Sequence, residues 1–106
     1  VVNVRNGNFQ DANGYTVNGS VEIRRQANNS VQLNFSSFSS DRSGNLFIYL
    51  SNSANGISGG VDLGSLNFRN GSFTVAVPAN VGVTDYDYVV IWCRAIGQSF
   101  GAAQLN

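Results

Sequence analysis

Apolar and polar residues alternate along much of the chain with a period of two. In residues 17–24 the apolar side chains Val17, Val21 and Ile23 lie between polar residues or glycine, and residues 31–35 repeat the pattern. This period is typical of a strand with one buried face. The polar segment 26–30 separates the two runs. The sequence therefore predicts an antiparallel hairpin here.

Further strands are expected at a spacing of about ten residues. Asn70-Gly71 favours a tight hairpin turn, which predicts that Phe68 and Phe73 face each other across it. We predict a single all-β domain over residues 1–106, an antiparallel β-sandwich of about seven or eight short strands, with a partly closed β-barrel as the alternative. The remaining strands are expected at residues 46–50, 63–68, 73–77, 88–94 and 100–105.

The strands at residues 46–50 and 88–92 are apolar on both faces, so both faces need cover. A second sheet or a loop is the simpler explanation. The alternative is a solvent-facing aromatic surface of Tyr49, Tyr88 and Trp92, which would stack a sugar ring or a flat cofactor. Alternation also predicts which residues share the main core: Val89, Ile91 and Cys93 with Phe73, Val75 and Phe100.

Composition excludes several kinds of chemistry. The 106 residues are 42% hydrophobic and 11% charged, with six cationic and six acidic residues, which argues against a nucleic-acid binder. The chain has no His and no Met, so it lacks His-based catalytic triads, His-ligated zinc and His or Met haem ligands. Asp85 and Asp87 lie on the same side of a strand-like segment, as a catalytic pair of acids would. Acidic residues are also common where strands begin, and this is the simpler explanation. We predict no independent enzyme, no catalytic residues, no metal site and no cofactor.

The composition also bears on the compartment. The chain has one cysteine and no lysine, and it is rich in Asn, Ser and Gly. Such a composition is typical of many extracytoplasmic β proteins, so we expect a secreted, periplasmic or cell-surface anchored protein, such as a lipoprotein. No apolar stretch is long enough to cross a bilayer, and we expect no transmembrane segment in this chain.

The end of the chain carries its most specific motif. Residues 88–94 read Tyr-Val-Val-Ile-Trp-Cys-Arg, and residues 100–105 read Phe-Gly-Ala-Ala-Gln-Leu. This pair of segments resembles the closing strands of the DM-thirteen domain family, an extracytoplasmic module. Residues 7–9, the strand at 46–51 and Val77-Pro78 match the family in the same order, so the resemblance covers nearly the whole chain.

The resemblance implies electron transfer through the single cysteine, Cys93, often beside DOMON domains, and hence a redox or haem-bearing partner domain. Two positions depart from the family pattern. Tyr15 stands where the family often has His, and Ser43-Gly44-Asn45 where it usually has Gly-Pro-Asp. The first departure argues against a His-dependent metal or haem role.

Two functional hypotheses follow. The first is an extracytoplasmic, non-enzymatic accessory or interaction module, linked to electron transfer through Cys93. The second is a carbohydrate-binding or adhesion domain that binds a glycan through the aromatic surface. For Cys93 itself, simple core packing competes with the redox role, because buried cysteines are common and alternation sends the neighbouring Arg94 to the opposite face. An intermolecular disulfide or a soft-metal ligand is a further alternative.

Overall fold

The computed structural model describes residues 2–11, 14–40, 46–53, 56–57, 59–66, 71–78, 81–82, 85–95 and 97–105. Within these residues the chain forms eight strands and no helix. The strands are β1 (Val2–Asp11), β2 (Val17–Arg25), β3 (Val31–Ser40), β4 (Leu46–Ser51), β5 (Val61–Ser65), β6 (Gly71–Val77), β7 (Tyr88–Cys93) and β8 (Gln98–Gln104).

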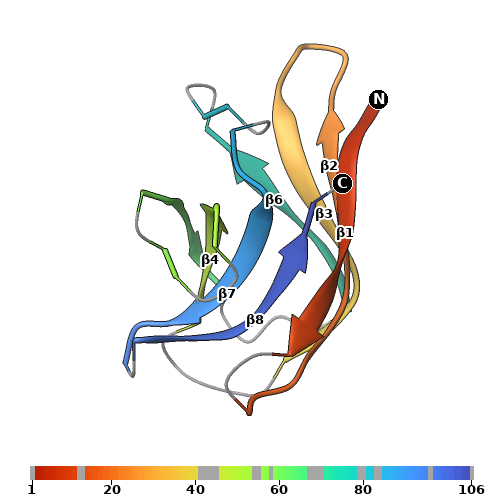
Figure 1. The fold of residues 1–106 in the computed structure, drawn as a ribbon. Coiled ribbons are helices and arrows are strands. Elements are labelled where there is room, and N and C mark those ends of the chain that lie inside the picture. The colour runs from red at the N-terminus through yellow and green to blue at the C-terminus, as the bar shows by residue number, and fades with distance from the viewer. Residues whose placement is uncertain are drawn as a thin grey trace.

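The strands form one antiparallel, strongly curved sheet in the order β5-β4-β7-β8-β1-β2-β3-β6 (Figure 1). The end strands β5 and β6 contact each other, although no backbone pairing joins them among the described residues. The all-β prediction is therefore confirmed, and the architecture is the alternative given above, a partly closed barrel.

β1 joins the two halves of the barrel. Its residues Val2 to Asn8 pair with β2, and Phe9 to Asp11 pair with β8. Two glycines allow the close approach that this change of partner needs. A Cβ added to Gly7 would lie 2.2 Å from the carbonyl oxygen of Gln104, and one added to Gly101 would lie 2.7 Å from that of Gln10. The backbones meet at these points because no side chain separates them.

The hairpin predicted from residues 17–35 is confirmed. β2 pairs with β3 from Val17↔Ser40 to Arg25↔Val31, and the backbone N–H of Gln26 donates to the carbonyl of Ser30 at 2.8 Å. Val17, Val21, Ile23, Leu33 and Phe35 are all buried, as their spacing predicts.

The predicted pairing of Phe68 with Phe73 stays a prediction, because Phe68 and Asn70 lie outside the described residues. Phe73 of β6 lies opposite Phe35 of β3. The rings of Phe35 and Phe73 stack with their centroids 4.6 Å apart. Pairing of β6 with β3 thus adds the half-buried ring of Phe73 to the aromatic cluster.

The main core fills the interior of the barrel. At its centre four phenylalanine rings lie within 6 Å of at least one other ring, and Phe35 contacts the other three. The four rings are those of Phe9, Phe35, Phe38 and Phe73.

The predicted grouping of the β7 residues with the main core is confirmed. Val89, Ile91, Cys93 and Phe100 are buried in it, and Phe73 and Val75 pack against it half-buried.

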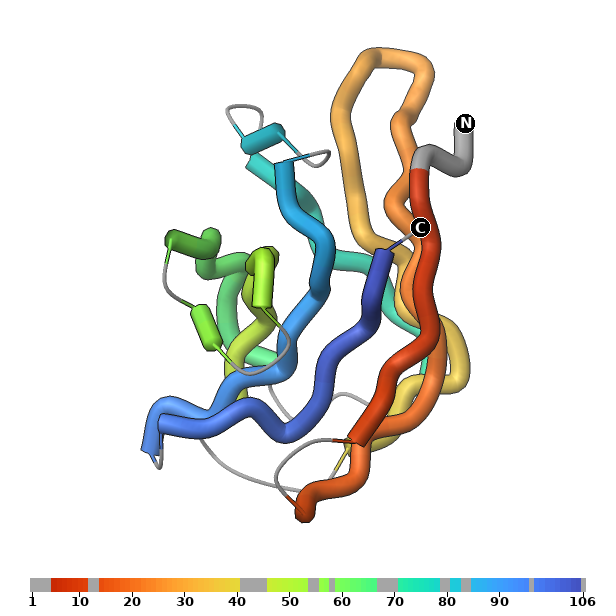
Figure 2. Tube along the Cα trace, viewed as in Figure 1, coloured from red at the N-terminus to blue at the C-terminus, as the bar shows by residue number. Residues whose placement is uncertain are grey.

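Arg5 links the first strand to the end of the chain. Its guanidinium donates to the carbonyl oxygen of Tyr86 and, at 3.0 Å, to that of Leu105. It also lies 3.4 Å from the carboxylate of Asp87, and its side chain is only 15% exposed. These contacts help to hold β1 beside the end of β8, and Figure 2 shows these two strands side by side.

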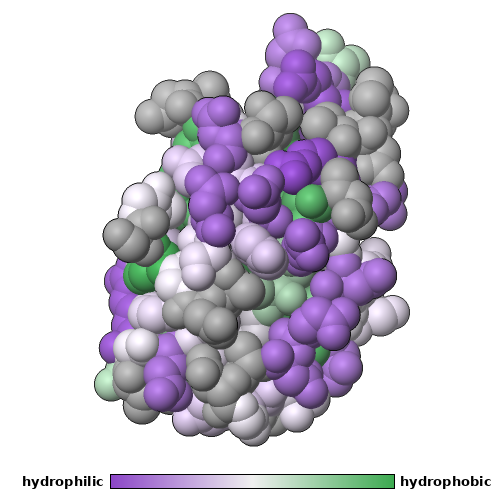
Figure 3. Space-filling model, in the orientation of Figure 1, coloured by the Kyte–Doolittle hydropathy of each residue, from purple (hydrophilic) through white to green (hydrophobic). Residues whose placement is uncertain are grey.

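Among the coloured residues on the face shown in Figure 3, hydrophilic ones predominate, with small hydrophobic areas between them. In the part of the chain that the structure describes, no helix has the length and apolar character needed to span a membrane.

Candidate functional site

Cys93 is the last residue of β7, and its side chain is 2% exposed. It lies opposite Leu46 of β4 on one side and Gln98 of β8 on the other. Its carbonyl accepts a hydrogen bond of 2.9 Å from the N–H of Gly97, in the turn that leads to β8. The residues that follow it, Arg94 and Ala95, are exposed. The thiol is therefore buried in the main core at the end of its strand, one residue from the surface.

A second apolar cluster covers the outer face of β4, β7 and β8. Tyr49, Val90 and Ala102 form its buried centre, with exposed fractions of 8%, 0% and 5%. The loop residue Ile57 packs against this centre together with three half-buried aromatic residues, Phe47, Tyr88 and Trp92. A loop residue is thus part of the cover for the second face of these strands, as the simpler explanation predicted.

The three residues predicted as a binding surface, Tyr49, Tyr88 and Trp92, all belong to this outer cluster. They differ in exposure, because Tyr49 is buried and the other two are half-buried. Phe47, which the prediction did not include, lies directly opposite Trp92 on the neighbouring strand. The accessible aromatic surface is therefore formed by Phe47, Tyr88 and Trp92, and a ligand-binding role for it stays a prediction.

Arg94 folds back over the edge of this cluster. The guanidinium carbon lies 3.7 Å from the centroid of the Phe47 ring. Nη2 donates to the hydroxyl of Tyr49 at 2.9 Å and pairs with the carboxylate of Asp62 on β5. The hydrogen bond to Tyr49 raises the pKa of Arg94, and the charges of Tyr49 and Asp62 add to this. Arg94 is therefore cationic throughout the pH range in which proteins stay folded.

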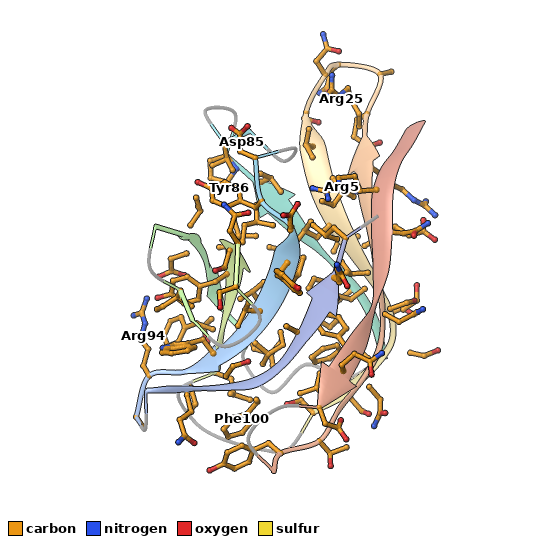
Figure 4. The ribbon with its side chains drawn as sticks, in the orientation of Figure 1. Arg5, Arg25, Asp85, Tyr86, Arg94 and Phe100 are labelled. Atoms are coloured by element: carbon orange, nitrogen blue, oxygen red, sulfur yellow. The ribbon has the colours of Figure 1, made fainter. Side chains whose placement is uncertain are left out.

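Figure 4 shows where several charged and polar side chains lie. Arg94 is beside the turn between β7 and β8, and Arg5, Arg25, Asp85 and Tyr86 are at the upper end of the barrel in this view. Asp85 is exposed, and the side chain of Asp87 is 65% exposed and contacts Arg5. The two carboxylates thus do not line an enclosed site.

Tyr15 stacks on Phe100, with the ring centroids 3.9 Å apart and the planes at 9°. Tyr15, which stands where the family often has His, thus makes an aromatic packing contact. Among the described residues, no group of three or more His, Cys, Asp or Glu is placed to hold a metal ion.

Comparison with known families adds the decisive observation. The model of the family described as Electron transfer DM13 matches residues 8–105, nearly the whole chain. The chain belongs to the DM13 family. No curated protein and no solved structure gives a significant match to it. The family description associates this DM13 domain with electron transfer, and the structure shows how its only thiol is held.

Alternation along residues 88–94 places Cys93 and Arg94 on opposite faces of the DM13 domain, as the sequence predicts. The sequence did not identify Phe47 or Asp62 as partners of Arg94, because both contacts depend on β4 lying between β7 and β5. The runs 46–50 and 88–92, which are apolar on both faces, were the sequence features that pointed to this outer surface.

Proposed function

We propose that this DM13 domain is an extracytoplasmic, non-enzymatic accessory module of an electron-transfer system, with the Cys93 thiol as its redox group. The observation that carries the proposal is the position of the chain's single sulfur atom. Cys93 is the only Cys, and His and Met are absent from the sequence. It ends β7 immediately before an exposed turn.

The chemistry that suits one thiol is exchange with the disulfide of a partner. The Cys93 thiolate attacks one sulfur of the disulfide, a mixed disulfide forms, and the other sulfur leaves as a thiolate. Cys93 is oxidised and the departing sulfur is reduced, so the electrons balance without a third reactant. One cysteine does not complete a redox cycle alone, so the partner supplies the second thiol.

The thiol is 2% exposed in the folded chain, so exchange requires a local opening at the end of β7. Strand ends beside turns open more readily than the core of a sheet. Arg94 is the cation next in sequence, and it lies on the opposite face. We therefore propose that Cys93 reacts during such openings and not in the closed state.

The location and the partner belong to the same proposal. A secreted, periplasmic or cell-surface site is supported by the lysine-free composition, rich in Asn, Ser and Gly, and by the resemblance. The partner is a redox or haem-bearing domain, in line with the family description. Fractionation of the cells that produce the natural protein tests the location, and recovery in the cytoplasm would contradict it.

The experiment is mixed-disulfide formation under native conditions. The chain is incubated with oxidised glutathione at neutral pH, and mass spectrometry follows the adduct on Cys93. We expect an adduct on the wild type without denaturant and none on Cys93→Ala. If the wild type forms the adduct only after it is unfolded, the redox proposal is wrong and Cys93 is a packing residue.

The outer aromatic surface supports a second candidate, carbohydrate binding. Phe47 and Trp92 face each other on neighbouring strands, half-buried, with the polar pair of Arg94 and Asp62 at the edge. Aromatic faces beside polar groups suit sugar rings, which carry apolar and hydroxyl surfaces. A glycan array followed by calorimetry tests it. Saturable binding that is lost in Trp92→Ala, with the fold retained, would place this candidate first.

A further inference from the structure

Arg94 connects three strands through one side chain. It begins at the end of β7, crosses the outer face of β4 and reaches β5. On β4 it covers the ring of Phe47 at 3.7 Å and donates to the hydroxyl of Tyr49 from both Nη2, at 2.9 Å, and Nε, at 3.3 Å. On β5 it pairs with the carboxylate of Asp62. We name these four side chains the Arg94 clasp: Phe47, Tyr49, Asp62 and Arg94.

Asp62 is held in place to receive the guanidinium. Its Oδ1 accepts a hydrogen bond of 2.7 Å from the N–H of Gly64, and its Oδ2 pairs with Arg94. Tyr49 lies directly opposite Asp62, at a register shift between β4 and β5. The two groups that accept hydrogen bonds from Arg94 therefore lie on two neighbouring strands, and release of Arg94 removes its side-chain contacts with both.

The Arg94 clasp is joined to Cys93 by a single peptide bond. Arg94 is anchored on the outer face, and Cys93 points to the core from the adjacent position. The chain then enters the turn, in which the N–H of Gly97 holds the carbonyl of Cys93. We therefore expect that any movement of the turn between β7 and β8 that uncovers the Cys93 thiol also separates Arg94 from Phe47 and Asp62.

We propose that Arg94 is a positioning residue that keeps the end of β7 closed over the Cys93 thiol, so that the Arg94 clasp sets how often the thiol becomes accessible. This inference rests on the proposed function of Cys93 and adds to it the residues that regulate access. The contact over Phe47 and the fork of donors to Tyr49 and Asp62 suit arginine better than lysine.

The test is the rate at which iodoacetamide alkylates Cys93 in the folded chain. When opening is rapid and rare, this rate is proportional to the population of the open form. We expect Asp62→Asn to raise the rate about two- to five-fold, the range set by the loss of an exposed ion pair. Arg94→Gln also loses the contact with Phe47, and the rate should rise about ten-fold. Arg94→Lys should lie between the wild type and Arg94→Gln.

The pair of Arg24 and Glu22 on β2 supplies a matched control. Its side chains are 42% and 34% exposed, close to the 45% and 40% of Arg94 and Asp62, and its nitrogen and oxygen lie 2.7 Å apart. Glu22→Gln breaks this pair without touching β4, β5 or β7. Its alkylation rate should equal that of the wild type.

Urea unfolding of each variant separates access from stability. Asp62→Asn and Glu22→Gln should unfold at similar urea concentrations while only Asp62→Asn is alkylated faster. Equal rates in the two variants, or a rise in rate that follows the loss of stability in both, would overturn the inference. The glutathione experiment tests the redox role separately. Altered alkylation rates without a glutathione adduct would support the inference about Arg94 and contradict the redox role of Cys93. A glutathione adduct with unaltered alkylation rates would support the redox role and contradict the inference.

Discussion

Replacing Gly101 by alanine tests how β8 closes the barrel against β1. Gly101 lies opposite Asp11 of β1 and Ile91 of β7, so it is paired with both neighbouring strands. An added Cβ would lie 2.7 Å from both the carbonyl oxygen of Gln10 and the Cβ of Val17. The first is backbone, and the second belongs to a fully buried side chain. Neither group has room to move away.

The size of the effect follows from these contacts. Ordinary van der Waals contacts of a Cβ begin at 3.4 Å, so the neighbours must shift by several tenths of an ångström. Overpacking of this kind costs about 1 to 3 kcal/mol. The φ of Gly101 is outside the left-handed region, so alanine also restricts the unfolded chain and returns about 0.4 to 1 kcal/mol. The middle values of these two ranges give a net loss of about 1.3 kcal/mol.

Urea unfolding followed by the fluorescence of Trp92, the only tryptophan, measures this loss. At a typical slope for a small domain, the midpoint should fall by about 1 M. Gly56→Ala is the control, because among the described residues its Cβ would meet only Ser53, at 3.8 Å, and its midpoint should not fall. If Gly101→Ala is as stable as Gly56→Ala, the close approach of β8 to β1 does not exist as described.

Three further substitutions test other parts of the account. Phe35→Ala removes the ring that contacts three others and should cost about 3 to 5 kcal/mol in urea unfolding; a loss below about 1 kcal/mol would contradict the aromatic core. Arg5→Gln should cost about 1 to 3 kcal/mol by weakening the contacts to Tyr86 and Leu105, while the exposed Arg25→Gln should change stability by less than about 0.5 kcal/mol. Equal effects would show that Arg5 does not hold the chain ends. Cys93→Ala should lower the free energy of unfolding by about 1 to 2 kcal/mol and keep the circular dichroism of a β protein. If Cys93→Ala is unfolded, it is not a valid control for the glutathione experiment.

Local patterns identified the strands whose sequences alternate most clearly. Val21 and Ile23 could be assigned to the core because a one-residue shift would bury their polar neighbours, Glu22 and Arg24, instead. β1 was not among the strands predicted from the sequence. It is mostly polar, and it is held by backbone pairing to β2 and β8, which leaves no periodic signal.

The long-range arrangement was beyond these patterns. No local pattern predicts that β6 pairs with β3, where Phe73 stacks on Phe35. The same limit applies to the site. Alternation separates Cys93 from Arg94, but only the strand order shows that Arg94 reaches Asp62.

The most direct test of the redox role is the urea dependence of mixed-disulfide formation at Cys93. Reaction through a local opening at the end of β7 exposes little surface, so its rate stays nearly constant at low urea concentration. Reaction through global unfolding rises steeply with urea because much surface is exposed. We predict a flat region below the unfolding transition, followed by a steep rise. A rate that rises steeply from the lowest urea concentration would contradict the redox role and leave Cys93 as part of the core.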